Sequence, residues 1–184
     1  MFRALLLKKS LLLGVFLIYP ASAAERPLSV CETLSNLRFY RGKVITITGI
    51  LGGGTRHGWI LKDRLDDEPC RNLEAQGRTW PAAIVLAEYT NGSDLEDGPA
   101  DFESETMQIE SLLSEPKKII QGRADLVIAA TFVGQLRSRK GVNIQRSKDG
   151  WYVGDGYGQS GQYPALLVLK RAREVRVIAK PRSK

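Results

Sequence analysis

Hydrophobic and polar residues alternate over short distances along much of this chain, which is the pattern of half-buried strands. Residues 43–51, with the sequence KVITITGIL, are dense in the β-branched residues that strands favour. A run of glycines separates them from a returning strand at residues 58–61. Further strands are expected over residues 79–87, 124–136, 142–145 and 165–178. The pattern predicts a mainly β fold.

Two segments have helical spacing instead. Ser29 and Glu32 form an S-x-x-E capping box, and the apolar residues that follow predict a short helix over residues 30–37. Residues 101–113 place apolar side chains on one face and acids on the other, which predicts a second helix that Pro116 stops.

The order of these elements limits the fold. It runs helix, three strands, helix, two strands, in hairpin-like succession. This order predicts a five-stranded Greek-key barrel of the OB type, with a short N-terminal helix and a helix between strands 3 and 4. Gly49 would bend the first strand, as a strand shared by two sides of a small barrel requires. A small β-sandwich and an α+β sheet with packed helices are the alternatives.

The first 23 residues have the pattern of a secretory signal peptide. Residues 1–10 carry three cations and no acid, and residues 11–19 form an apolar run interrupted only by Gly14. Residues 21–23, Ala-Ser-Ala, provide the small side chains of a cleavage site. The apolar run is shorter than the ~20 residues that span a bilayer, so we expect cleavage instead of a membrane anchor.

The expected signal peptide determines how we divide the chain into domains and which cellular compartment we expect. We assign residues 1–23 to the signal peptide, residues 24–180 to a single OB-like domain and residues 181–184 to a basic tail. The protein is therefore expected to be secreted or periplasmic. A lipoprotein cut before Cys31 is the alternative, but Val30 stands where such a signal needs a small residue.

The mature chain contains two cysteines, Cys31 and Cys70, and an even number in an exported protein predicts a disulfide. Two free buried thiols are the alternative. A zinc site would need further ligands, because His57 is the only histidine. We expect neither a metal nor a cofactor.

Four segments frame most of the mature chain. They are Val30-Cys31-Glu32, the run YRGKVITITG at 40–49, Trp59-Ile60-Leu61 with Asp63 and Cys70 behind it, and the run GYGQSGQYPALL at 156–167. Together they resemble a group of small secreted bacterial OB-fold proteins of unassigned activity. The resemblance implies an OB-fold and a Cys31–Cys70 bridge, and it implies no ligand or reaction. The family pattern has His where this chain has Gln159.

Charge is distributed unevenly along the mature chain. The leader holds three of the 27 cations and none of the 20 acids, which leaves a formal charge of +4. Residues 88–116 contain nine acids and no Lys or Arg, whereas residues 117–184 contain fifteen cations and four acids. Such a basic half suggests a polyanionic partner. The alternative is that the two segments attract each other and maintain solubility.

The candidate ligand-binding residues are three aromatics and two cations of this basic half. They are Trp151, Tyr152, Tyr157, Arg137 and Arg139. Aromatic rings stack on bases or sugars while cations follow anionic groups, so this mixture is typical of single-stranded nucleic acid and oligosaccharide sites. Packing of the aromatics over a glycine-rich loop is the alternative.

The remaining motifs predict no catalytic residue. The glycine-rich residues 154–158 lead into a strand, whereas a phosphate loop needs a helix there. Asp63, Asp66, Asp67 and Glu68 offer oxygen ligands for calcium, but they lack EF-hand spacing, and a solvated acidic loop is expected.

We therefore expect an exported, non-catalytic binding module whose ligand is a glycan or another polyanion. Export favours a cell-wall or envelope glycan over nucleic acid. A protein-interaction or structural component of the envelope is the alternative, and a hydrolase with an unrecognised carboxylate pair is the third hypothesis.

Overall fold

The computed structural model of the chain describes residues 26–54, 58–65, 68–88 and 108–180. Several expectations fall outside these ranges: the signal peptide, His57, two acids of the calcium hypothesis (Asp66 and Asp67), the start of the helix expected at 101–113, and the tail at 181–184.

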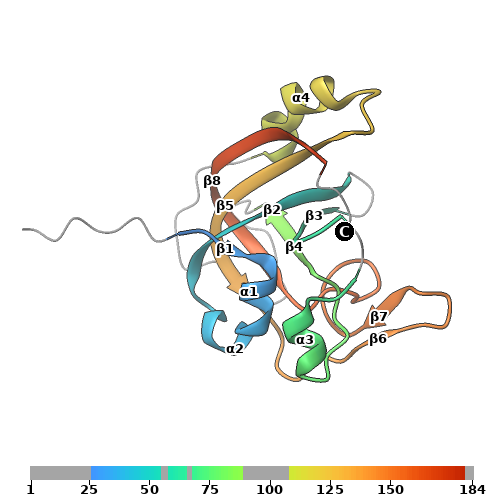
Figure 1. The fold of residues 1–184 in the computed structure, drawn as a ribbon. Helices are drawn as coiled ribbons and strands as arrows, with labels where there is room; N and C mark the ends of the chain where they lie inside the picture. Colours follow the sequence, from blue (N-terminus) through green and yellow to red (C-terminus); the bar gives the residue numbers. More distant parts are fainter. Residues whose placement is uncertain (1–25, 55–57, 66–67, 89–107, 181–184) are drawn as a thin grey trace, which may run out of the picture.

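Strands form the body of the molecule and helices lie at its ends (Figure 1). The strands are β1 (Leu28–Ser29), β2 (Val44–Gly54), β3 (Gly58–Lys62), β4 (Ala83–Glu88), β5 (Leu126–Arg137), β6 (Ile144–Arg146), β7 (Tyr152–Gly154) and β8 (Leu166–Ala179). The helices are α1 (Val30–Ser35), α2 (Leu37–Tyr40), α3 (Arg71–Ala75) and α4 (Ile109–Ile120).

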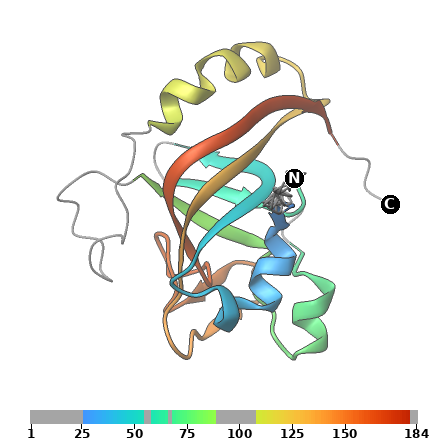
Figure 2. The same cartoon turned by 90° about the vertical axis from the view of Figure 1, so that its left-hand side faces the viewer.

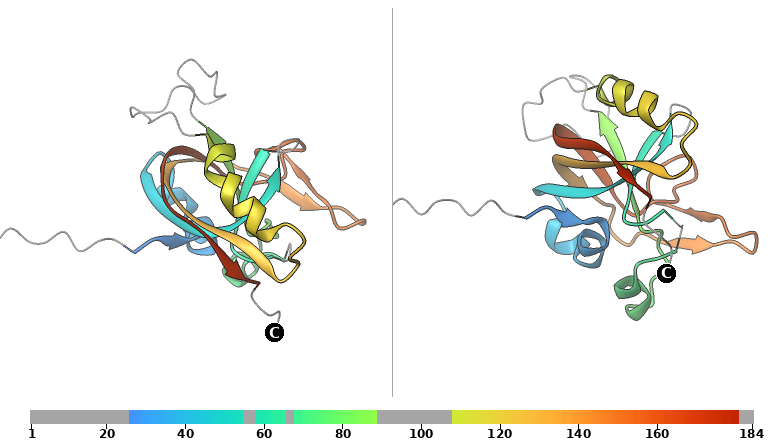
Figure 3. Two further views of the ribbon diagram at one scale, coloured as in Figure 1. Left: turned by 90° about the horizontal axis from the view of Figure 1, so that it is seen from above. Right: turned by 45° about the horizontal axis from the view of Figure 1, so that its top comes forward.

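Five strands close into a barrel. Their order is β2, β3, β4, β8 and β5, and β5 pairs with β2 to complete the ring. The β4–β8 pair is parallel and the other barrel pairs are antiparallel. The expected mainly β, five-stranded barrel is thereby confirmed, and the sandwich and open-sheet alternatives are wrong. β6 and β7 form a separate hairpin that projects from the barrel (Figure 3).

Large apolar side chains from all five strands fill the barrel interior. The fully buried ones include Ile47, Leu61, Ile84, Phe132 and Leu167. Removal of each such side chain from water contributes roughly 1.5–3 kcal/mol. The interior is therefore a packed core and not a ligand channel.

β2 changes its partner in mid-strand. It pairs with β5 up to Ile50 and with β3 from Ile50 onward. A Cβ atom on Gly49 would lie 2.6 Å from the backbone oxygen of Lys62, so this crossing point has room only for glycine. The structure thus supports the role expected for Gly49, although the strand continues beyond the predicted end at residue 51 to Gly54.

Helices lie at both ends of the barrel (Figure 2). α4 crosses one end, as the view from above shows (Figure 3), and α1 and α3 lie at the other. Leu34 of α1 and Leu113 of α4 both belong to the core that contains the barrel side chains. In the part of the chain that the structure describes, no helix has the length and hydrophobicity to cross a membrane.

A disulfide joins two of these helical segments. Cys31 lies in α1, Cys70 is the N-cap of α3, and their sulfurs are bonded. The bridge predicted from the cysteine count is confirmed, and the alternative of two free thiols is wrong.

The first helix begins as its capping box predicts. The Ser29 Oγ accepts from the Glu32 backbone N–H at 3.1 Å, and the Glu32 carboxylate accepts from the Ser29 backbone N–H at 2.8 Å. The helical segment is split, however: α1 ends at Ser35, and α2 begins again at Leu37 after Asn36.

α4 differs from its prediction, because it continues through Pro116 and ends at Ile120. Pro116 has no N–H to donate to the Leu112 carbonyl, and Leu112 is an exposed residue of the helix. The ion pair between Lys118 and Glu115 supports the turn that contains the proline. The expectation that Pro116 stops the helix is wrong.

Two strand boundaries also differ. The third barrel strand was expected over residues 79–87, but it begins at Ala83, because Pro81 has no N–H to donate to a ladder. The fourth barrel strand was expected to end at residue 136, but β5 includes Arg137, which pairs with Leu166 and is buried.

Candidate functional site

Four arginines surround one small hollow at the end of the barrel that carries α2 and α3. The hollow has a volume of about 150 Å³. It is lined by Leu37, Arg38, Arg41, Arg78, Trp80, Arg139, Gly141 and Val142. Three stretches of chain contribute these residues: α2 and its C-cap, the connection from α3 to β4, and the loop after β5.

α2 holds two of the arginines in place. Its first residue, Leu37, is buried in the core, whereas Arg38 is exposed. Arg41 caps the helix and is fixed by two hydrogen bonds: its Nε donates to the Ser138 Oγ at 2.9 Å and its Nη2 donates to the Arg139 carbonyl at 3.0 Å. Arg41 therefore ties α2 to the loop after β5.

Arg139 is fixed in turn by the next loop. Its Nη1 donates to the Asp155 carbonyl at 2.7 Å, and its guanidinium carbon lies 5.3 Å from the centre of the Tyr157 ring. These contacts hold one side of the hollow in a defined shape, which reduces the entropy lost when a ligand binds.

Arg38 and Arg78 are held by fewer contacts. The Arg78 guanidinium carbon lies 4.7 Å from the centre of the Trp80 ring, which is a cation–π contact. Among the described residues, no carboxylate contacts Arg38 or Arg78, and no Asp or Glu lines the hollow. Guanidinium groups gathered without acids repel one another, and a bound anion removes that repulsion.

The five residues predicted to bind ligand differ in exposure and in surroundings. Arg139 lines the hollow and is half-buried, whereas Arg137 is buried and its Nη2 lies 3.4 Å from the Gln135 Oε1. Trp151 is 72% exposed and stands next to the start of β7 on the projecting hairpin. Tyr152 and Tyr157 are only 7% exposed each, so their ring faces are largely covered by protein.

Tyr157 packs on the outer surface of the barrel. It forms a small cluster with Leu166 and Val168 of β8, and Val85 and Ala87 of β4 pack against this cluster. The arrangement matches the packing alternative for this ring. The Tyr157 ring thus helps to position Arg139, which stacks near it.

The glycine-rich loop has a structural reason for its glycines. A Cβ atom on Gly156 would lie 2.1 Å from the Tyr163 carbonyl oxygen, closer than any real Cβ contact. The flanking residues Tyr157 and Tyr163 form an isolated bridge, and the chain then enters β8 and not a helix. The loop is a tight backbone path without the helix N-terminus of a phosphate loop.

Sequence reasoning missed three of the four arginines. Arg38, Arg41 and Arg78 were not singled out, nor was Trp80. The available signal was local: two arginines flank the aromatic pair in the run RFYR at 38–41, and the run RTW at 78–80 places a cation near a tryptophan. Nothing in the sequence says that these runs meet.

The acids of the calcium hypothesis have structural partners where they are described. Asp63 accepts a hydrogen bond from the Cys31 backbone N–H at 2.9 Å, and Glu68 lies 3.8 Å from Arg146. Within the described ranges, no group of three or more His, Cys, Asp or Glu side chains is placed to hold a metal ion.

Comparisons with known proteins do not assign the chain to a family: no family model, no curated protein and no solved structure matches it.

Proposed function

We propose that this chain is an exported, non-catalytic binding module of the OB type, and that it binds an anionic glycan or a similar polyanion through the arginine-lined hollow. The observation that carries the proposal is the gathering of Arg38, Arg41, Arg78 and Arg139 around one opening without a lining carboxylate. Guanidinium groups bind carboxylate, sulfate and phosphate through paired hydrogen bonds, so the donors suit any of these anions.

The strand order supports the OB assignment. Numbered along the chain, the barrel strands lie in the order 1-2-3-5-4 and close back on strand 1, with strands 3 and 5 parallel. α4 comes between strands 3 and 4 in the chain, where an OB-fold carries its helix. The connection between strands 4 and 5, which contributes Arg139, belongs to the ligand-binding loops of that fold.

Two features support export and therefore the choice of ligand. The chain begins with the pattern of a signal peptide, and its disulfide is typical of an oxidising compartment. Outside the cytosol, acidic cell-wall and envelope glycans are the abundant polyanions, which favours them over nucleic acid.

The projecting hairpin offers a second contact. Trp151 is exposed near Lys148, so its ring can stack on a sugar while the cation meets an anionic substituent. In this proposal Trp151 and Arg139 touch the ligand, whereas Tyr152 and Tyr157 support the loops that carry them.

The experiment is a titration of the purified protein with a sulfated glycan, a neutral glycan and an oligonucleotide. Tryptophan fluorescence is the readout, because Trp80 lines the hollow. We expect saturable binding of the sulfated glycan that weakens steeply between 50 and 200 mM salt, as release of counterions requires (~10³-fold for about six contacts). The neutral glycan should give no comparable change.

Two matched double variants distinguish binding at the arginine-lined hollow from attraction to the overall positive charge of the protein. Arg38→Gln with Arg78→Gln should weaken binding by about tenfold or more, since two charge-assisted contacts are lost. Arg171→Gln with Arg173→Gln removes the same charge from exposed positions of β8 and should have a small effect. Equal losses in the two pairs, or no saturable binding at all, would contradict the proposal.

One observation favours the alternative function, an envelope protein-interaction component. Trp151 and Val153 are both exposed, and their i, i+2 spacing along an extended segment places them on one face of the hairpin. If this face binds a partner protein, Val153→Lys should abolish capture of that partner from an envelope fraction. The same variant should not weaken glycan binding at the arginine-lined hollow.

A further inference from the structure

A second hollow lies beside the first half of β2, where the sheet is incomplete. On the side of β2 opposite β5, β1 pairs only with Ile47 and Thr48, and β3 begins to pair at Ile50. The start of β2 therefore has no neighbouring strand there among the described residues. The resulting hollow measures about 290 Å³ and is lined by Arg26, Leu28, Phe39, Tyr40, Lys43, Val44, Ile45, Thr46 and Val133.

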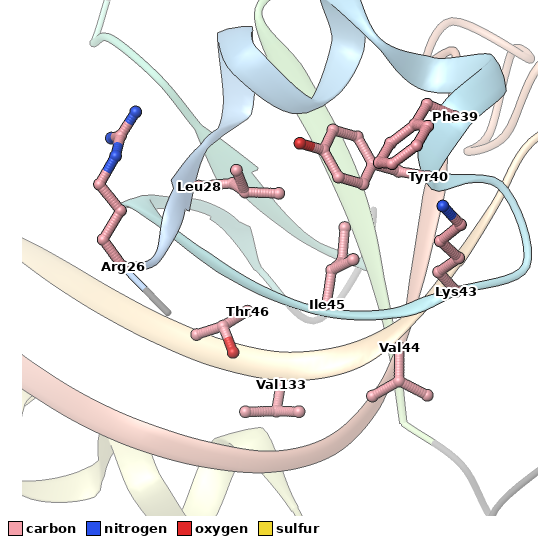
Figure 4. Close-up of a pocket in the computed structure, with 9 residues that line it drawn as sticks. All are labelled: Arg26, Leu28, Phe39, Tyr40, Lys43, Val44, Ile45, Thr46 and Val133. Carbon is pink, nitrogen blue, oxygen red and sulfur yellow. The ribbon is translucent and has the colours of Figure 1, made fainter. Parts of the chain in front are cut away.

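The lining is apolar between two cations. Figure 4 shows Arg26 and Lys43 toward opposite sides of the hollow, with Leu28, Tyr40 and Ile45 between them. This arrangement offers an apolar surface of limited length with charge at its ends. Its volume is close to the ~300 Å³ at which pockets for small molecules begin.

Two apolar side chains on the Lys43 side of the hollow are exposed. Phe39 is 64% exposed and the adjacent Val44 is 47% exposed. The Phe39 and Tyr40 rings meet edge to face at 5.0 Å, so they form one continuous wall. Exposed apolar side chains beside a hollow provide a surface that an apolar ligand could cover.

The two cations differ in whether a carboxylate already contacts them. Arg26 forms an ion pair with Glu32, so its charge is already compensated. The Lys43 ammonium lies 3.3 Å from the centre of the Phe39 ring, and no carboxylate among the described residues contacts it. The hollow therefore has one cation available to a ligand, at the end where the exposed apolar side chains lie.

From this geometry we propose that the hollow binds a small amphiphile with one carboxylate, of the class of medium-chain fatty acids. The carboxylate accepts hydrogen bonds from the Lys43 ammonium, and the alkyl chain lies along Leu28, Tyr40 and Ile45 toward Arg26. The site is separate from the arginine-lined hollow, so it holds whether or not that hollow binds a polyanion.

The test is isothermal titration of the purified protein with octanoate, octanol and octylamine, each below its micelle concentration. The three probes share an alkyl chain and differ in charge. We expect octanoate to bind with saturation and about tenfold more tightly than octanol, which keeps the apolar contact but loses the charge-assisted hydrogen bond. Octylamine should bind more weakly than octanol, because its ammonium meets Lys43.

Variants locate the effect. Lys43→Gln should reduce octanoate affinity about tenfold and leave octanol affinity unchanged. Val44→Asp, at an exposed position that the core does not need, should reduce octanoate affinity further by placing a like charge at the rim. Lys140→Gln removes an exposed cation that lines neither hollow, and it should leave octanoate binding unchanged.

Three results would overturn the proposal. They are the absence of saturable octanoate binding, an octanoate preference that survives Lys43→Gln, and an equal loss in Lys140→Gln. Circular dichroism of each variant shows that the fold is retained.

Discussion

At the scale of single residues, the contacts that an arginine already makes decide what it can offer a ligand. Arg41 donates hydrogen bonds to the Ser138 hydroxyl and to a backbone carbonyl, and Arg139 donates to another backbone carbonyl. These bonds fix the positions of both arginines. Among the described residues no carboxylate contacts Arg38 or Arg78, so their donors are available to the anion proposed above. The hollow therefore combines two arginines held in place by hydrogen bonds with two that are less constrained.

The capping residue Glu32 gives a prediction about pH. Its pKa lies below the ordinary value of 4.5, first because the Ser29 backbone N–H donates to the carboxylate and also because Arg26 donates to it. A lowered pKa in the folded state stabilises the protein above pH 4.5, and this contribution is lost as the pH falls through the folded-state value.

We therefore expect Glu32→Gln to be less stable than the unsubstituted protein at pH 7, with a difference that shrinks below pH 4.5. Urea unfolding of both proteins at pH 7, 5 and 3 measures it. A difference that stays constant over this range would show that the charge of Glu32 has no such role. Ser29→Ala removes the other half of the capping box and should cost about 1 kcal/mol at neutral pH.

At the scale of elements, most of the fold could be predicted because its signals are local. The alternation of apolar and polar residues predicted the barrel strands, and the capping box of Ser29 and Glu32 predicted the start of α1. The errors occurred where a distant contact overrides the local signal. Core contacts of Leu113 hold α4 in place despite Pro116, and the pairing of Arg137 with Leu166 extends β5 into a segment that resembles an exposed turn.

The crossing point of β2 gives a prediction at this scale. Gly49→Ala should destabilise the protein by about 1–3 kcal/mol, because the new Cβ would meet the Lys62 backbone oxygen and the strand must shift. Gly52→Ala is the matched control in the same strand, where the nearest atom is the flexible end of the Lys62 side chain at 3.3 Å. Thermal unfolding compares the two variants. Similar losses would mean that glycine is not specifically required where β2 changes partner.

At the scale of the whole molecule, the candidate site could not be predicted, because it exists only after folding. Arg38, Arg78 and Arg139 come from three separate stretches of chain, and each taken alone has the composition of an ordinary exposed segment. The sequence predicted a site near Trp151, because aromatic and basic residues are neighbours along the chain there. These residues do not form one exposed surface, since the rings of Tyr152 and Tyr157 pack against the protein.

The disulfide acts at this same scale, because it links the two helical segments that lead to the arginines. Cys31→Ser with Cys70→Ser should destabilise the protein by up to ~4 kcal/mol, given the 39-residue separation of the cysteines. Urea unfolding measures that loss. In conditions where the variant stays folded, its affinity for the sulfated glycan should also fall, because α1 and α3 are no longer held together. An unchanged affinity would show that the bridge stabilises the fold without positioning the hollow.

The bridge also makes the arrangement of the two helical segments depend on redox conditions. In a reducing environment the Cys31–Cys70 bond would be absent, and only non-covalent contacts would hold α1 beside α3. Oxidation would therefore complete the folded arrangement of this end of the barrel.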